Sequence, residues 1–391
     1  MSQGRITNRP YETAFSISRI DAWACRAPIK GGSVATSFGI MRDRPAVFVR
    51  IEDDQGWFGW GEIFANWPAA GAEHRVNLLM DDIAEIVLGK LWQTPEEMFW
   101  SLEKKTQIRA IQCGEQGPFA HVIAGLDITA WDLVSRRAEL PLAKAINANA
   151  HQHVPVYASG IQIGAAQAEV PKARKAGFDA FKVKVGFGAD DANRLVELSH
   201  AMKATERLFA DANQAWSFDG ARSFLQATRS VSLGWMEEPL RVDDAPQNWA
   251  ELAALGVPLA GGENMAGKSE FADALASGSY SFLQPDVAKW GGITGCHEVA
   301  RDIVEAGRTY CPHFLGGGIG LAASAHLLAA IGGSGLLEVD FNANILRAGF
   351  SSVEESINGG NWAIGSEPGI GITELPAAVL ATVSLVRSCC V

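Results

Sequence analysis

The feature that most constrains the fold of this chain is a regular alternation of short apolar segments with helix-like segments from residue 150 onwards. Eight apolar segments follow one another, and their β-branched and aromatic residues are typical of buried strands. They read VPVYASG, AFKVKVG, RLFADAN, LGWMEEP, VPLAGGEN, YSFLQPD, RTYCPHF and LLEVDF. Eight evenly spaced βα units favour a closed parallel α/β barrel over the alternative, an open doubly wound sheet.

An ionisable residue lies at the C-terminal end of seven of these eight segments, and successive members are 23 to 27 residues apart. The seven are Lys184, Asp211, Glu237, Glu263, Asp286, His313 and Glu338. In a parallel barrel, the active site is built at the rim where the strands end. A helix cap or a salt-bridged loop residue would explain any one of them, but the regular series favours a shared site.

Three of the seven are carboxylates on consecutive strands, namely Asp211, Glu237 and Glu263. Converging anionic oxygens repel one another unless a hard cation lies between them, and Mg²⁺ suits oxygen ligands while keeping positions for water or substrate. We therefore predict a Mg²⁺ site, with Mn²⁺ as a possible substitute. Glu238 should point to the opposite side in a supporting role. Asn213 should share the face of Asp211 and bond a substrate hydroxyl.

Lys182 and Lys184 lie two residues apart in an otherwise apolar strand, so their side chains point the same way. A nearby cation disfavours a charged ammonium, so the metal and Lys182 are expected to lower the pKa of Lys184 towards the range of a general base. The alternative is that both lysines only form salt bridges with the carboxylates.

Asp286 and His313 end adjacent predicted strands. A carboxylate beside an imidazole fixes its tautomer and stabilises the imidazolium, which gives a general acid or base. Glu338, which ends the eighth strand, is a candidate hydrogen-bond donor to a developing oxyanion if its site holds it protonated.

The rest of the chain indicates an α+β domain before the barrel. Residues 17–63 are expected to form antiparallel strands, and residues 75–147 are expected to be helical. We predict a capping domain over residues 1–135, a barrel over 136–345 and a C-terminal segment over 346–391.

Composition excludes several classes of protein. A net charge of −11 and a pI near 5.3 argue against nucleic-acid or anionic-membrane partners. No signal peptide and no apolar run long enough for a membrane helix are visible, and the six cysteines show no CxxC spacing. A cytoplasmic protein with reduced thiols is expected.

In this order and spacing, the motifs resemble the enolase superfamily, specifically the mandelate racemase/muconate lactonizing enzyme family and its mandelate racemase-like subgroup. The resemblance covers nearly the whole chain and rests on AGLDITAWDLVSRRAELPL, FKVKVG, DANQAW, EEP, GEN, PDVAKWGG, the His after the seventh strand, and PGIGI. It implies a (β/α)7β TIM-like barrel whose C-terminal tail completes the capping domain, and a homo-oligomer. The glycine-rich segment after His313, with Thr129, Ser135 and AKAINANA, departs from the family pattern.

The resemblance also implies roles for the residues. Asp211, Glu237 and Glu263 would bind Mg²⁺, and Lys184, modulated by Lys182, would be the base on one face of a small carboxylate substrate. His313, paired with Asp286, would act on the other face, and Glu338 would bond the enediolate. An Asp–His pair resembles the mandelate racemase subgroup, whereas a lysine in place of Asp286 would indicate the muconate-lactonizing or epimerase subgroups.

The shared step would remove the proton α to a carboxylate, after which two outcomes are open. Return of a proton to the same carbon makes a racemase or epimerase, whereas loss of a β-hydroxyl makes an acid-sugar dehydratase that gives a 2-keto-3-deoxy acid. A third reading is a barrel that binds a ligand without chemistry, but none of the residues needed for the reaction is missing.

The resemblance implies that the distal end of the substrate meets two lid segments of the capping domain, about 26–40 and 62–71. Phe64 and Trp67 make the second segment apolar, which favours racemisation or epimerisation of a compact acid, although these rings could instead pack the domain interface. Lys289, in PDVAKWGG, is a further expected substrate contact.

Overall fold

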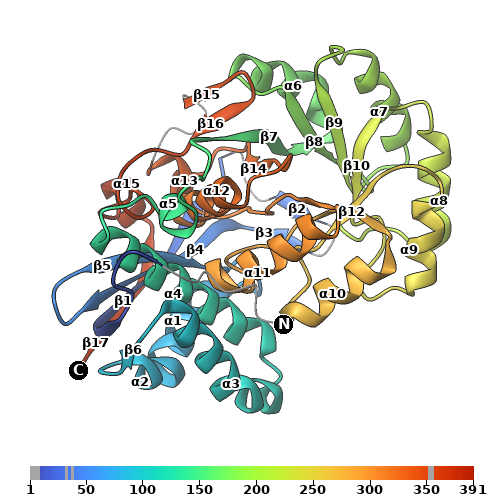
Figure 1. The fold of residues 1–391 in the computed structure, drawn as a ribbon. Coiled ribbons are helices and arrows are strands. Elements are labelled where there is room, and N and C mark those ends of the chain that lie inside the picture. Colours follow the sequence, from blue (N-terminus) through green and yellow to red (C-terminus); the bar gives the residue numbers. More distant parts are fainter. Residues whose placement is uncertain (1–8, 31–33, 37–38, 351–355) are drawn as a thin grey trace.

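The computed structural model describes residues 9–30, 34–36, 39–350 and 356–391 (Figure 1). The predicted first lid segment includes residues 31–33 and 37–38, which lie outside this description. None of the described helices combines the length and the apolar character that crossing a membrane requires.

The N-terminal part is an antiparallel sheet with helices on one side. The sheet has the order β17-β1-β4-β5, and β6 pairs with the start of β1. Its strands are β1 (Phe15–Pro28), β4 (Asp43–Asp53), β5 (Phe58–Ile63), β6 (Leu91–Trp92) and β17 (Val383–Cys390). The last strand confirms that the C-terminal segment returns to this domain. A small ribbon contains β2 (Val34–Thr36) and β3 (Gly39–Met41).

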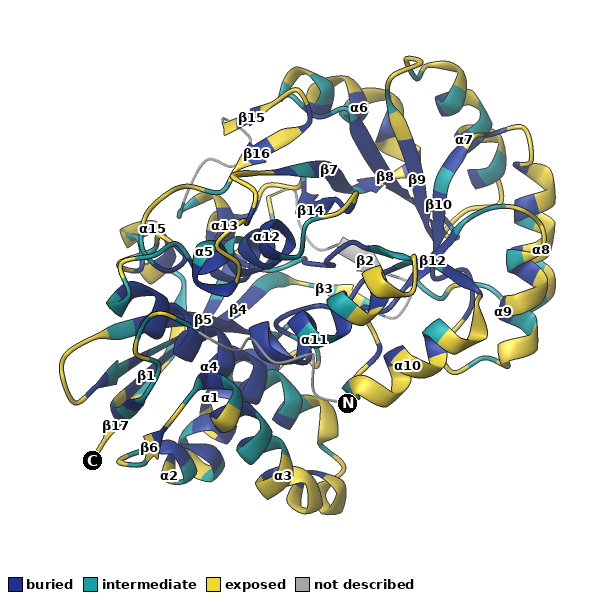
Figure 2. Ribbon diagram, viewed as in Figure 1, coloured by how far each residue is buried: buried dark blue, intermediate teal, exposed yellow. Residues whose placement is uncertain are grey.

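The helices of this part follow β5. They are α1 (Gly71–Leu78), the π-helical η1 (Leu79–Ile83), α2 (Ala84–Val87), α3 (Pro95–Cys113), α4 (Gln116–Arg137) and α5 (Leu142–Ile146). Helix α4 is buried along most of its length (Figure 2). It packs on β5 so closely that a Cβ at Gly59 would lie 2.0 Å from the carbonyl oxygen of Thr129. On the barrel side, Trp131 Nε1 of α4 donates to Thr294 Oγ1 at 2.9 Å.

Among the described residues, eight parallel strands form the barrel in the order β13-β12-β11-β10-β9-β8-β7-β14. They are β7 (His153–Gln162), β8 (Ala180–Lys184), β9 (Arg207–Asp211), β10 (Leu233–Glu237), β11 (Leu259–Gly261), β12 (Tyr280–Leu283), β13 (Thr309–Tyr310) and β14 (Leu337–Asp340). The end strands adjoin, because Leu336 N donates to Cys311 Sγ at 3.4 Å. The interior of the barrel contains stacked aromatic rings, and the ring centroids of Phe209 and Trp235 are 3.6 Å apart.

A helix follows each of the first seven barrel strands, which confirms the predicted (β/α)7β order within the described chain. These helices are α6 (Ala166–Lys175, preceded by the 3₁₀ turn η2, Ile163–Ala165), α7 (Asp191–His200), α8 (Phe218–Ala227), α9 (Pro246–Ala253), α10 (Gly267–Ser277), α11 (Gly292–Glu305) and α12 (Gly318–Ile331). After β14 come α13 (Ile345–Ala348), β15 (Ile357–Asn358), β16 (Asn361–Ala363) and α15 (Ala377–Leu380).

Candidate active site

The strand register brings the predicted charged residues together at the C-terminal rim of the barrel. Lys184 pairs with Asp211 across β8 and β9, and Asp211 pairs with Glu237 across β9 and β10. Because residues i and i+2 of a strand share a face, Lys182 points into the same region as Lys184. The rim therefore carries four successive carboxylates, from Asp211 to Asp286, with lysines on one side and His313 on the other, and nearly all of these groups are buried.

Lys182 is the centre of this network. Its Nζ lies 2.5 Å from Glu237 Oε1, 2.8 Å from Glu338 Oε1 and 3.4 Å from Asp211 Oδ2, and the side chain is only 1% exposed. Lys184 Nζ lies 2.5 Å from Asp211 Oδ2. Both lysines thus make the carboxylate contacts that the alternative prediction described.

The carboxylates around Lys184 act on its pKa in the opposite direction to the predicted cation. Burial acts to lower the pKa of its ammonium, but Asp211 opposes this and the pKa is raised above its ordinary value. The expected lowering assumed a cation between the carboxylates, whereas the groups that face Lys184 here are mainly negative.

The groups around Glu338 do not favour the protonated form on which its candidate role as a hydrogen-bond donor depends. Burial acts to raise the pKa of this carboxyl, but the charges of Lys182 and His313 lower it below its ordinary value. Glu338 accepts hydrogen bonds from Ser159 Oγ at 2.5 Å and from Phe314 N at 3.1 Å. In this structure Glu338 is a hydrogen-bond acceptor, and the candidate donor role would require its protonation.

The predicted Asp–His pair is present. His313 Nδ1 lies 2.7 Å from Asp286 Oδ2, and its Nε2 lies 2.6 Å from Glu263 Oε2. Burial acts to lower the pKa of His313, but Glu263 and Glu338 together with Asp286 raise it to about 10. The imidazole is therefore charged and can donate a proton.

The chemistry of three carboxylates fits a hard cation. Asp211, Glu237 and Glu263 supply only oxygen donors from adjacent strands, and all three are buried. Burial and the charge of Asp211 raise the pKa of Glu237 to about 8 although Lys182 acts to lower it, so a further cation beside these carboxylates would be electrostatically favourable. Within the described chain, no three acidic, His or Cys side chains are already arranged as a metal-binding site. The carboxylates of the rim instead contact Lys182, Lys184 and His313.

Beside the rim lies a cavity of about 840 Å³, within the size range of small-molecule sites. It is bordered by three of the seven charged residues and all four predicted substrate contacts: Lys184, Glu263, His313, Phe64, Trp67, Asn213 and Lys289. Lys182, Asp211, Glu237, Asp286 and Glu338 are buried and are not part of the cavity wall. Lys289 Nζ lies 4.9 Å from the centre of the Phe64 ring and 3.5 Å from Glu263 Oε1.

Glu238 has the supporting role expected of it. The carboxyl is buried and accepts hydrogen bonds from Asn264 Nδ2 at 2.9 and 3.1 Å, and the same amide donates to Glu263 Oε1 at 3.0 Å. Glu238 therefore orients Asn264 against a candidate metal ligand.

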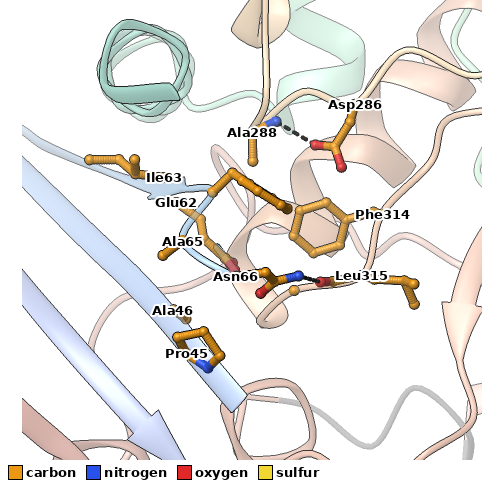
Figure 3. A pocket seen from close by; sticks show the side chains of 12 residues that line it. Pro45, Ala46, Glu62, Ile63, Ala65, Asn66, Asp286, Ala288, Phe314 and Leu315 are labelled. Carbon is orange, nitrogen blue, oxygen red and sulfur yellow. Dashed lines mark hydrogen bonds between the residues drawn. The ribbon is translucent and has the colours of Figure 1, made fainter. Parts of the chain in front are cut away.

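The capping domain contributes a buried carboxylate that the sequence analysis missed. Glu62, at the end of β5, accepts hydrogen bonds from Gly317 N at 2.5 Å and Gly320 N at 2.8 Å, where α12 begins. Nearby, Asn66 Nδ2 donates to the carbonyl of Leu315 at 3.2 Å (Figure 3). These contacts fix the glycine-rich segment after His313 against the capping domain.

Arg44, Gln162, Asp340 and Asn342 also border the cavity and were not predicted. Asp340 could have been found, because it lies two residues after Glu338 and shares its strand face. Gln162 pairs with Lys184 in register, but that pairing is visible only in the folded sheet.

Comparison with known proteins assigns the family. Residues 18–146 match the mandelate racemase/muconate lactonizing enzyme N-terminal domain, and residues 165–377 match the enolase C-terminal domain-like family. The chain belongs to the mandelate racemase/muconate lactonizing enzyme family of the enolase superfamily.

Among characterised members, the chain is 31% identical to a 3,6-anhydro-alpha-L-galactonate cycloisomerase of Streptomyces coelicolor, over 73% of this chain and 78% of that protein. It is 26% identical to an arabinonate dehydratase of Saccharolobus solfataricus, over 84% and 87%. Homologous family enzymes thus include cycloisomerases and acid-sugar dehydratases.

Similar solved structures also come from this family. A mandelate racemase/muconate lactonizing enzyme from Bordetella bronchiseptica is 44% identical, with a TM-score of 0.88 over 94% of this chain and 99% of that one. A racemase from Streptomyces coelicolor, solved with bound magnesium, is 25% identical, with a TM-score of 0.82 over 94% and 99%. Racemases therefore also occur among the homologues.

Proposed function

We propose that this protein is an acid-sugar dehydratase, which removes the proton α to a carboxylate and eliminates the β-hydroxyl to give a 2-keto-3-deoxy acid. The observation that carries this proposal is the wall of the cavity that also holds Lys184 and His313. Gln162, Asn213 and Asn342 border it, and amide side chains can both donate to and accept from hydroxyl groups. The names of several relatives, including the arabinonate dehydratase, support the same chemistry.

In this proposal, Lys184 Nζ accepts the α-proton and His313 Nε2 donates a proton to the departing hydroxyl, which leaves as water. The electron pair of the broken C–H bond forms the C=C bond of an enol as the C–O bond breaks, and the enol then tautomerises to the keto acid. Asp286, 2.7 Å from His313 Nδ1, holds the ring and stabilises its charged form.

Asp211, Glu237 and Glu263 would hold a Mg²⁺ ion. Bound there, the ion would stabilise negative charge on the substrate carboxylate and weaken the attraction between Asp211 and protonated Lys184. Lys182 adds a fixed positive charge beside the same carboxylates, 1% exposed and therefore poorly screened by water.

Racemisation or epimerisation is the second candidate. Phe64, Trp67 and Trp290 border another part of the cavity, and this apolar surface suits a compact, partly apolar acid. The same pair, Lys184 and His313, would then exchange protons at one carbon from its two faces.

The test is incubation with Mg²⁺ in D₂O and a panel of aldonates, aldarates, other 2-hydroxy acids and N-substituted amino acids, followed by proton NMR. A 2-keto-3-deoxy product supports dehydration, whereas loss of the α-proton signal without a new product supports racemisation or epimerisation. Lys184→Ala should abolish either change, and Lys175→Ala, at an exposed position on α6, should not. Exchange that survives Lys184→Ala would disprove the assigned base.

A further inference from the structure

The two ends of the cavity differ in chemistry. Strands β7 and β14 pair in register, with Asp340 opposite Ser159, so Gly160, Gln162, Asp340 and Asn342 gather at one end. The end near β12 carries Phe64, Trp67, His121 and Trp290 instead. We call the first of these the β7–β14 end.

Arg44 extends from the start of β4 to the β7–β14 end. Its Nη1 lies 3.5 Å from Asp340 Oδ2, and no shorter polar contact of this guanidinium occurs within the described chain. Its Nε is buried and has no hydrogen-bond partner among the described residues. A guanidinium has five N–H donors, so most of the hydrogen-bonding capacity of Arg44 is not used by this ion pair.

Asp340 does not fully satisfy Arg44. Its Oδ1 accepts hydrogen bonds from Asn342 N at 3.0 Å and Asn342 Nδ2 at 2.7 Å, which fixes the carboxylate in place. Its Oδ2 lies 3.6 Å from Arg347 Nη1 as well as 3.5 Å from Arg44 Nη1, so this oxygen does not contact Arg44 alone. The N–H groups of Arg44 that Asp340 does not use could therefore donate to a further anionic group in the cavity.

We propose that Arg44 binds a second carboxylate of the substrate, which is then a dicarboxylic polyhydroxy acid. This inference rests on the proposed function, which places the reacting carboxylate at the metal-binding rim. The planar guanidinium matches a carboxylate through two parallel hydrogen bonds. Gln162 and Asn342 would bind the hydroxyl groups between the two ends, and the negative charge of Asp340 disfavours a more highly charged phosphate.

The test compares a six-carbon aldarate with the aldonate of the same configuration as substrates. The wild-type protein should prefer the aldarate in kcat/KM by about 10- to 100-fold, the size of a hydrogen-bonded charge contact. Arg44→Met should reduce this preference to near parity, mainly by raising KM for the aldarate. Arg44→Lys keeps the positive charge but cannot make the two parallel hydrogen bonds of a guanidinium, so it should give an intermediate preference. The matched control, Arg222→Met, changes an exposed arginine on α8 and should leave the preference as in the wild type.

The inference would be overturned if Arg44→Met lowered kcat/KM equally for both acids. It would also be overturned if the wild-type protein showed no preference for the aldarate. If Arg44→Met does not fold, as judged by its melting curve, Arg44→Lys decides by the same ratio.

If neither acid reacts, the proposed function fails, and the inference is decided separately by calorimetric binding of the two acids with Mg²⁺ present. Tighter binding of the aldarate that Arg44→Lys weakens would support the subsite. Equal affinities, or no binding of either acid, would refute it.

Discussion

Replacing Lys182 by methionine tests whether the buried charge network holds the rim together. Lys182 Nζ contacts Glu237, Glu338 and Asp211 within 3.4 Å, and every partner is at most 2% exposed. Methionine fills a similar volume without the charge. Removing one partner of a buried ion pair costs about 3–5 kcal/mol, because the remaining charge is left unpaired.

That loss can be converted into a melting temperature. With an unfolding entropy of about 2.1 cal/mol/K per residue, 391 residues give a decrease of about 4–6 °C in the absence of divalent cations. The assay is thermal unfolding in EDTA, with Lys175→Met, an exposed position on α6, as the matched control. Added Mg²⁺ should stabilise Lys182→Met more than the wild type, because the ion would replace part of the missing positive charge.

The pH dependence gives a second readout. Without Lys182 the carboxylates should have raised pKa values, so protonation below those values relieves their repulsion. The stability deficit of Lys182→Met should therefore be greatest at alkaline pH and should shrink as the pH falls. Burial and Asp211 already raise the pKa of Glu237 to about 8 in the wild type, where Lys182 acts to lower it, so in Lys182→Met the change should begin above that pH. A deficit that is absent in EDTA, or that grows on acidification, would refute the argument.

Three further predictions concern the metal, the domain contact and the capping sheet. Mg²⁺ at 100 times its dissociation constant should raise the free energy of unfolding of the wild type by about 2.7 kcal/mol, and EDTA should reverse the effect in a melting assay; no shift would contradict the metal site. Glu62→Ala leaves Gly317 N and Gly320 N without their acceptor and should cost about 1–3 kcal/mol per lost bond in urea unfolding, whereas Glu62→Gln, which keeps one acceptor, should cost less. Gly59→Ala would place Cβ 2.0 Å from the Thr129 carbonyl and should lower stability by about 1–3 kcal/mol; unchanged stability would mean that β5 and α4 can separate easily.

Much of the fold could be predicted because the barrel is encoded locally. Each strand is a short apolar segment, and each ends in a residue whose position relative to the strand fixes where its side chain lies. The alternation of faces placed Lys182 and Lys184 together, and the structure agrees because β8 runs unbroken through Lys184. The return of the C-terminal strand to β1 came from the family resemblance, since no local pattern indicates that pairing.

The charge states could not be predicted in the same way. They depend on distances between side chains that are far apart in sequence, such as the 2.8 Å between Lys182 and Glu338. The sequence analysis made Glu338 a candidate hydrogen-bond donor on condition that its site keeps it protonated, but Lys182 and His313 lie beside it. The Arg44–Asp340 contact joins two domains and likewise has no local signal.

The position of each group suggests how reaction and specificity are separated in this protein. All the residues to which we assign chemistry lie on β8 to β14 or just after these strands, where buried ion pairs couple them to one another. Of the residues to which we assign selection of the substrate, Arg44, Phe64 and Trp67 lie in or just after strands of the capping domain, whereas Gln162, Asn213 and Asn342 lie on the barrel. A substitution at Lys182 or Glu338 must therefore be balanced by another charge, whereas a substitution at Arg44 alters one side of the cavity. Change of substrate should accordingly require fewer compensating substitutions than change of chemistry.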